Sequence, residues 1–170
     1  MIKKMKKKTF LFSALLLVLI LVSVTPASAH FMSSGKHSVD NGEIRWGTFH
    51  GSTQWTSARN TAIARWDAEG VINIAGDTSS TIEDLSFTDY SSKDGVLGSW
   101  TQFPGADRIR FNNYYFDDMR ACERNKTALH EMGHALNLDH NSVAGSVMRS
   151  GTICQSFLGV HDKSDLRERW

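Results

Sequence analysis

The sequence predicts a single α+β domain, because helical and strand-like patterns both occur along it. Apolar residues recur at three- and four-residue steps in residues 54–69 and 125–136, which is the spacing of a helix that buries one face. Segments rich in β-branched and aromatic residues, bounded by turn-forming residues, lie at residues 71–74, 85–90, 96–103 and 108–112. We therefore expect a sheet and two main helices around one core.

The first residues have the layout of a secretory signal peptide. Five lysines within residues 3–8 precede an apolar stretch from Phe10 to Val24, and Ala27-Ser28-Ala29 follows it. The alternative is an uncleaved membrane anchor, but the apolar stretch is short for a bilayer and the small-residue site follows it directly. We expect cleavage after residue 29 and a secreted, extracellular protein with no stable membrane association.

Length and charge restrict what the mature chain can be. The 170-residue chain without its first 29 residues has 141, which suits one domain and not two. Loss of five lysines leaves 14 basic against 18 acidic residues, so the formal charge changes from +1 to −4. No basic run remains that would hold nucleic acid or anionic lipid, and no long apolar pattern predicts assembly, so we expect a monomer.

The mature chain begins with a polar arm and continues as the domain itself. Residues 30–42 are rich in Ser, Gly and His and predict a flexible N-terminal arm, and residues 43–170 form the predicted domain. Ile44 and Trp46 indicate a first strand, and Gly51-Ser52-Thr53 supplies a cap for the helix at 54–69. A short helix is expected at residues 163–170.

The clearest strand pattern lies shortly before the second helix. Ile109 and Phe111 alternate with Arg108 and Arg110, and Asn112 completes the segment. One face is therefore apolar and the other charged, as in a half-exposed strand. We expect this strand to lie at an edge of the sheet.

Residues 130–140 read His-Glu-Met-Gly-His-Ala-Leu-Asn-Leu-Asp-His and carry the predicted chemistry. His130 and His134 are four residues apart, so on a helix both imidazoles reach a single ion. Zinc suits three imidazole ligands with a fourth position left for water. A chain of this composition would contain His-Glu-x-x-His by chance about once in a hundred, and the third histidine makes the pattern rarer still.

His140 can join the other two ligands only if the helix ends before it. Ten further residues of helix would place it about 15 Å along the axis from His130. Asn137 is the residue best suited to end the helix, because Asn tolerates the left-handed conformation better than most residues. We therefore expect the chain to turn at Asn137 and bring His140 back to the metal.

Glu131 is the expected general base. It adjoins the first ligand, and zinc makes deprotonation of water feasible near neutral pH, so a zinc-activated water could attack a peptide carbonyl. The sequence thus predicts a zinc-dependent endopeptidase acting on proteins or peptides. The alternatives are a secreted zinc-binding module and a zinc hydrolase of non-peptide amides.

Cys122 and Cys154 flank the predicted metal site. In an exported chain they can form a disulfide that ties the start of the active-site helix to a later loop. The alternative is a pair of buried free thiols.

His-Glu-x-x-His-x-x-Asn-x-x-His, followed by Ser146-Val147-Met148, resembles the extended zinc signature and Met-turn of the metzincin metallopeptidases, and Glu-Met-Gly-His-Ala-Leu resembles the matrixin branch. The resemblance implies a twisted mixed β-sheet packed on two long helices, with a short C-terminal helix after the Met-turn. It also implies that Met148 forms an apolar floor beneath the imidazoles, although an ordinary core methionine is the alternative. The strand from Arg108 to Asn112 would pair with the substrate.

The sequence departs from that resemblance in three respects. Asn137 stands where the family has glycine, and no matrixin propeptide with its latency cysteine separates the signal from the first strand. No clear motif supports a calcium site or a second zinc, so one catalytic zinc ion is expected. The remaining histidines are scattered, and we assign no metal role to His30, His37, His50 and His161.

Overall fold

A computed structural model of the chain describes residues 29–170. The predicted signal peptide therefore lies outside the described residues, except for Ala29. The elements occur along the chain as β1 (Glu43–Gly47), α1 (Thr56–Asp67), β2 (Asn73–Gly76), β3 (Leu85–Tyr90), β4 (Gly98–Thr101), β5 (Asp107–Asn112), α2 (Asn113–Phe116), α3 (Ala121–Ala135) and α4 (Val160–Arg169).

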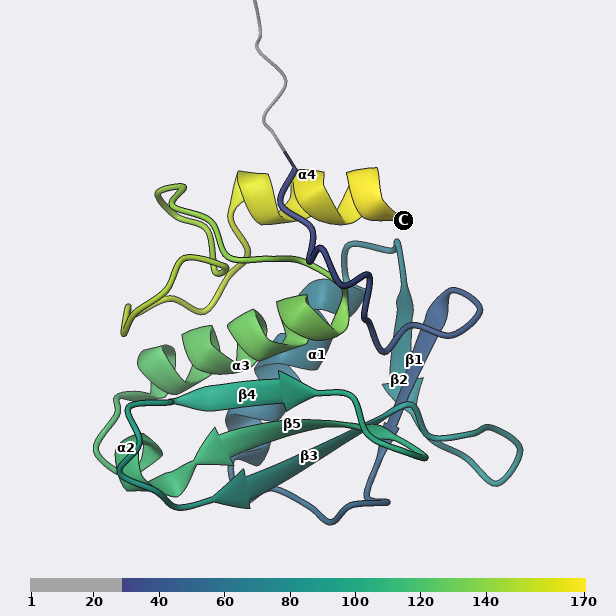
Figure 1. Cartoon of the computed structure of the whole chain (residues 1–170), viewed down its shortest axis with the longest axis horizontal. Helices are drawn as coiled ribbons and strands as arrows, with labels where there is room; N and C mark the ends of the chain where they lie inside the picture. The colour runs from purple at the N-terminus through teal and green to yellow at the C-terminus, as the bar shows by residue number, and fades with distance from the viewer. Residues whose placement is uncertain (1–28) are drawn as a thin grey trace, which may run out of the picture.

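The strands form one five-stranded mixed sheet in the order β2-β1-β3-β5-β4 (Figure 1). β1, β2, β3 and β5 are parallel, and β4 pairs antiparallel with β5. The expectation that residues 108–112 form an edge strand was wrong, because β5 lies between β3 and β4. The alternation of apolar and charged side chains reports that a strand has two different faces, not how many neighbours it has. The edge strand of the described sheet on this side is β4.

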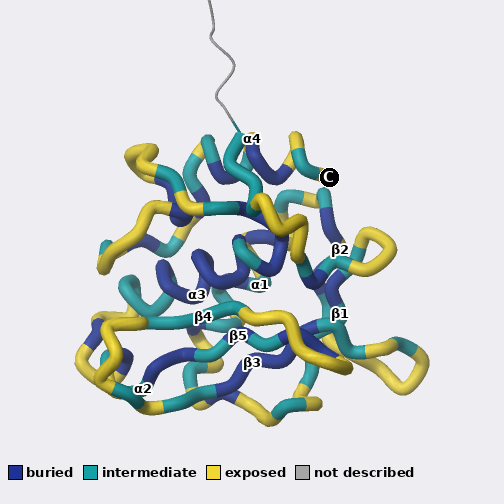
Figure 2. Tube along the Cα trace, in the orientation of Figure 1, coloured by how far each residue is buried: buried dark blue, intermediate teal, exposed yellow. Residues whose placement is uncertain are grey.

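The two main helices, α1 and α3, pack against each other on one face of the sheet (Figure 1). Trp66 of α1 is fully buried, and its indole Nε1–H donates to the carbonyl of Leu129 in α3 at 3.0 Å. The middle of α3 is buried (Figure 2), including Lys126, His130 and Glu131. A rigid core therefore supports the residues that carry the predicted chemistry.

α1 does not start at the predicted cap. The Thr53 side chain accepts from the backbone N–H of Trp55 at 3.0 Å and donates to Asp89 of β3 at 2.5 Å. It therefore fixes the turn before α1 to the sheet, and the helix begins at Thr56 without a side-chain cap.

The N-terminal arm makes three backbone hydrogen bonds to the end of α3 and the turn after it. Met32 N donates to Asn137 O at 3.0 Å, Ser38 N to Ala135 O at 2.8 Å, and Asp139 N to the carbonyl of residue 30 at 2.8 Å. Polar composition suggested a loose arm, but the carbonyl and amide groups at the end of α3 supply partners that no local pattern reveals.

α4 lies across the same end of α3, and Trp170 Nε1 donates to Leu136 O at 3.0 Å. No helix within residues 29–170 is both long and apolar enough to cross a membrane.

Candidate metal centre

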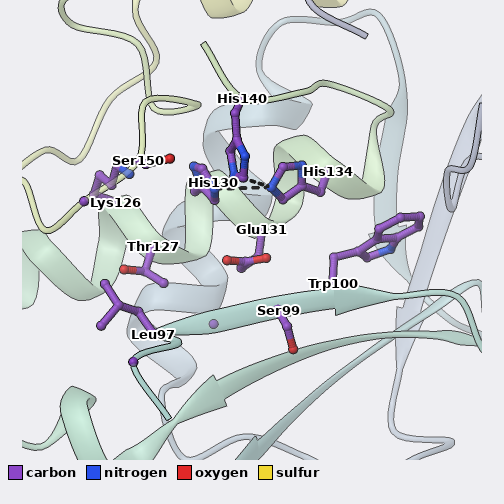
Figure 3. A pocket seen from close by; sticks show the side chains of 13 residues that line it. Leu97, Ser99, Trp100, Lys126, Thr127, His130, Glu131, His134, His140 and Ser150 are labelled. Atoms are coloured by element: carbon purple, nitrogen blue, oxygen red, sulfur yellow. Dashed lines mark hydrogen bonds between the residues drawn. The ribbon is translucent and has the colours of Figure 1, made fainter. Parts of the chain in front are cut away.

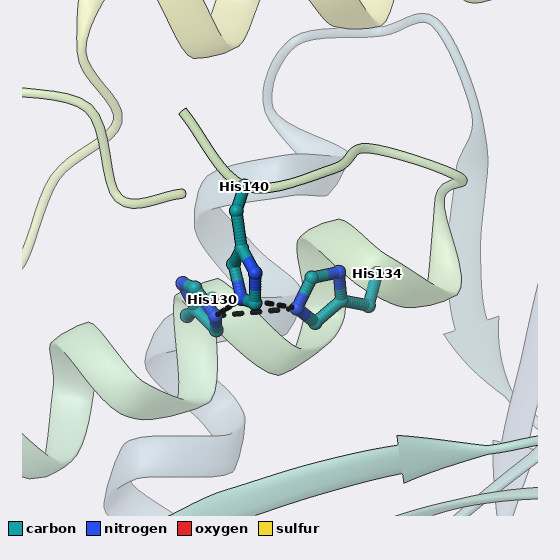
Figure 4. Close-up of side chains that lie close together, drawn as sticks. All are labelled: His130, His134 and His140. Carbon is teal, nitrogen blue, oxygen red and sulfur yellow. Dashed lines mark hydrogen bonds between the residues drawn. The ribbon is translucent and has the colours of Figure 1, made fainter. Parts of the chain in front are cut away.

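Three imidazole nitrogens converge at one point beside α3 (Figure 4). The Nε2 atoms of His130 and His140 are 3.0 Å apart, and His134 Nε2 lies 3.2 Å from each of them. His130 and His134 project from consecutive turns of α3. His140 lies in the segment that follows the C-terminal end of α3, and its side chain points back toward them. The structure thus brings together the three histidines that the spacing singled out.

The return of His140 depends on a tight C-terminal cap. α3 ends at Ala135, and Asn137 adopts the left-handed conformation with φ +69°. Leu138 N donates to Gly133 O and Asn137 N donates to His134 O, both at 2.9 Å. These two bonds form a Schellman motif, which reverses the chain within three residues.

Two of the imidazoles are held in a defined tautomer by backbone carbonyls. His130 Nδ1 lies 2.8 Å from Val147 O, and His134 Nδ1 lies 2.9 Å from Leu138 O. A carbonyl only accepts, so each Nδ1 carries the proton and each Nε2 presents a lone pair. The close approach of His130 Nε2 to His134 Nε2 is therefore not a hydrogen bond between them.

Burial also favours the neutral form that a metal ligand needs. Desolvation, assisted by His134 and Lys126, lowers the pKa of His130 to about 3. Desolvation likewise lowers the pKa of His134, against the hydrogen bond to Leu138. Both imidazoles are uncharged at neutral pH and can coordinate without first losing a proton.

The donor set fits a zinc ion. Ligand nitrogens about 2.05 Å from a tetrahedral zinc lie about 3.3 Å from one another, and the observed separations are 3.0 to 3.2 Å. The Nε2 lone pairs of His130 and His134 and the Nε2 atom of His140 face one point, which favours a cation there. His130, His134 and His140 would hold the ion, and His140 is the exposed member of the three.

Glu131 lies beneath the histidines and above β4 (Figure 3). The residue is 5% exposed, and burial raises the pKa of its carboxyl to about 8, opposed by a hydrogen bond from the Trp100 backbone and by the charge of Lys126. A carboxyl with a pKa near neutral pH can both accept and return a proton.

The histidines and Glu131 line a cavity of about 400 Å³ whose opposite wall is β4. Sequence reasoning missed Gly98 of β4, which allows that strand to approach the helix. A Cβ at Gly98 would lie 3.0 Å from Glu131 Cγ and 3.1 Å from Thr127 Cγ2. The free edge of the described sheet thus runs beside the general-base candidate, whereas Arg108, Ile109, Arg110, Phe111 and Asn112 belong to the strand behind it.

Met148 is fully buried and packs against α3 at Gly133, where a Cβ would clash with its sulfur. Its loop is fixed from α4, because Asp162 accepts from Val147 N at 2.9 Å and Gly159 N at 2.7 Å. The same loop supplies the Val147 carbonyl that orients His130. Met148 and its neighbours therefore pack against the helix that carries His130 and His134.

Cys122 and Cys154 are joined by a disulfide, with their Cα atoms 4.7 Å apart. Gln155 N also donates to Cys122 O at 3.2 Å, and Asn125 donates to the Ser156 hydroxyl at 3.0 Å. The first turns of α3 therefore anchor the far end of the loop that carries Met148.

Comparison with known proteins gives a likeness of fold. No protein-family model and no curated protein matches the sequence. Among solved structures 101 chains match. One is a chain of the structure described as the GM1-bound form of the ECX AB5 holotoxin. The match has a TM-score of 0.53 and 18% identity, and it covers 76% of this chain and 80% of that chain.

The prediction of a metzincin-like fold on two long helices was wrong as a description of this chain. A solved structure that it resembles is described as a holotoxin, and α1 and α3 have only 12 and 15 residues. The fold is a small α+β structure with a five-stranded mixed sheet. The resemblance depended on residues 130–148. The spacing of the ligands there predicts one helix and the turn that follows it, but it does not predict the strands of the sheet.

Proposed function

We propose that this chain is a secreted zinc-dependent endopeptidase. The observation that carries the proposal is the convergence of three imidazole Nε2 atoms, 3.0 to 3.2 Å apart, above the buried carboxyl of Glu131. A structural zinc site needs no adjacent proton acceptor and usually has a fourth protein ligand. The cavity beside these residues leaves room for a substrate.

When bound, zinc would supply a Lewis acid that polarises a carbonyl and lowers the pKa of water. The chain's own residues hold and move the protons. Glu131 would accept a proton from the attacking water on a carboxylate oxygen and deliver it to the leaving amine nitrogen. Burial raises the pKa of this carboxyl, which favours its holding the transferred proton until the amine leaves.

β4 is the strand that would align an extended peptide. Within the described sheet it pairs on one side with β5, and its other edge lies beside the cavity. Backbone groups along a free edge bind an extended chain through main-chain hydrogen bonds, which suits a peptide better than a small amide.

The decisive experiment compares wild type with Glu131→Gln and with Glu168→Gln, a matched change at an exposed glutamate of α4. Zinc content is measured for each protein, and cleavage of a mixed peptide library is followed with and without chelator. We expect Glu131→Gln to keep zinc and lose at least about a hundredfold in cleavage rate, while Glu168→Gln matches wild type.

Zinc-loaded wild-type protein that cleaves no peptide would refute the peptidase proposal and favour a zinc-binding module. Cleavage of small amides alone would favour the non-peptide amidase. A further variant, His140→Ala, should bind zinc at this centre at least about tenfold more weakly, and unchanged binding would refute its role as the third ligand.

A further inference from the structure

A second group of potential metal ligands lies away from the first, where the N-terminal arm meets α4. His161 and Asp165 are one turn apart on α4, so their side chains share a face. His30 reaches them from the arm, 131 residues from His161 in the sequence. Figure 1 shows the start of the described chain passing beside α4.

The three ligand atoms form a compact triangle. His30 Nδ1 lies 3.2 Å from His161 Nε2, and Asp165 Oδ2 lies 3.3 Å from His161 Nε2 and 3.9 Å from His30 Nδ1. Two edges agree with the roughly 3.3 Å expected around a tetrahedral zinc. The third is longer, and His30, with a side chain 37% exposed, has room to close it.

The carboxylate in this group is buried, and the backbone nitrogen of His30 donates to its Oδ2 at 3.5 Å. The Asp165 side chain is only 2% exposed. Within residues 29–170 both imidazoles contact this carboxylate, and neither Lys nor Arg forms an ion pair with it. A divalent cation would compensate the buried charge and satisfy both ring nitrogens at once.

We propose that His30, His161 and Asp165 bind a divalent transition-metal ion, which ties the N-terminal arm to α4. Two imidazoles and one carboxylate form a donor set that suits zinc, with a fourth position open to water. The site is independent of the proposed peptidase chemistry, because none of the three residues lines the cavity around Glu131.

The second ion would stabilise the neighbourhood of the first. The carbonyl of His30 accepts from Asp139 N at 2.8 Å, and Asp139 precedes His140. Fixing His30 therefore fixes one end of the segment that returns His140 to the first centre. We expect removal of the second ion to release the arm before it affects the fold of the domain.

The test is metal stoichiometry on the purified, chelator-treated chain reloaded with zinc alone. Wild type should bind two ions, His161→Ala one, His140→Ala one, and the double variant none. His50→Ala is the matched control, because His50 contacts Ala106 O and lies in neither group, and it should bind two. Cobalt absorption spectra of His140→Ala then report the ligand set of the second site directly.

The proposal is overturned if His161→Ala still binds two ions, or if wild type binds a single ion that His140→Ala abolishes. A single ion lost in His161→Ala but retained in His140→Ala would instead uphold this site and contradict the first. Asp165→Asn, which preserves shape, repeats the measurement if His161→Ala fails to fold. Zinc should also protect residues near His30 from proteolysis in His140→Ala but not in the double variant.

Discussion

Asn137 joins three parts of the molecule, so its replacement tests how the metal centre is held. Its backbone ends α3 in the left-handed conformation at φ +69°. Its side-chain amide donates to Lys36 O of the arm at 2.8 Å and accepts from Arg169 Nε of α4 at 2.7 Å. Substitution with glycine removes the side chain while keeping the turn, and alanine removes the side chain while opposing the turn.

The expected magnitudes follow from these contacts. Each lost hydrogen bond contributes about 1 kcal/mol net, so Asn137→Gly loses about 2 kcal/mol. The easier left-handed conformation of glycine is offset by about 1 kcal/mol of extra entropy in the unfolded chain. Asn137→Ala loses the same bonds and adds about 1 kcal/mol of strain. Asn137→Gly should therefore unfold roughly 4 to 8 °C below wild type, with Asn137→Ala lower still.

Thermal and urea unfolding of both variants, measured without metal, separate the two contributions. Zinc titration then reports the placement of His140, and we expect Asn137→Gly to retain binding because the turn is preserved. A glycine variant at least as stable as wild type would refute the contribution of the side-chain bonds. Equal stability of the glycine and alanine variants would refute the backbone argument.

Three further predictions concern the surroundings of the site. Replacing both Cys122 and Cys154 by serine opens a connection that spans 32 residues and should lower the free energy of unfolding by about 3 to 4 kcal/mol in urea titrations; an unchanged midpoint would contradict this. Gly133→Ala should destabilise by about 1 to 3 kcal/mol, because the new Cβ would clash with the buried Met148 sulfur, and combining it with Met148→Ala should cost less than the sum of the two single changes. Burial lowers the pKa of Lys126 from 10.5 to about 8, so the unfolded chain binds more protons between these values and metal-free stability should rise with pH there. Lys126→Met should reduce that rise by about 1 to 2 kcal/mol between pH 8 and 10, and a parallel pH profile would show that Lys126 is not responsible.

The sequence alone determined those features that depend on short-range spacing. The interval between His130 and His134 places two imidazoles on one helical face wherever that helix packs. The position of His140 requires the helix to end between it and His134, and the chain reverses at Asn137. Helical period likewise located residues 54–69, within which α1 occupies Thr56–Asp67.

Only the tertiary structure decided the features that depend on partners distant in sequence. Alternation along residues 108–112 could not show that β4 lies outside β5, because strand order is set by pairing between segments. Polar composition could not show that the arm binds the end of α3, and nothing local places His30 beside His161, 131 residues away. Helix periodicity is a property of neighbouring residues, whereas sheet order and ligand convergence arise when burial of the core brings remote segments together.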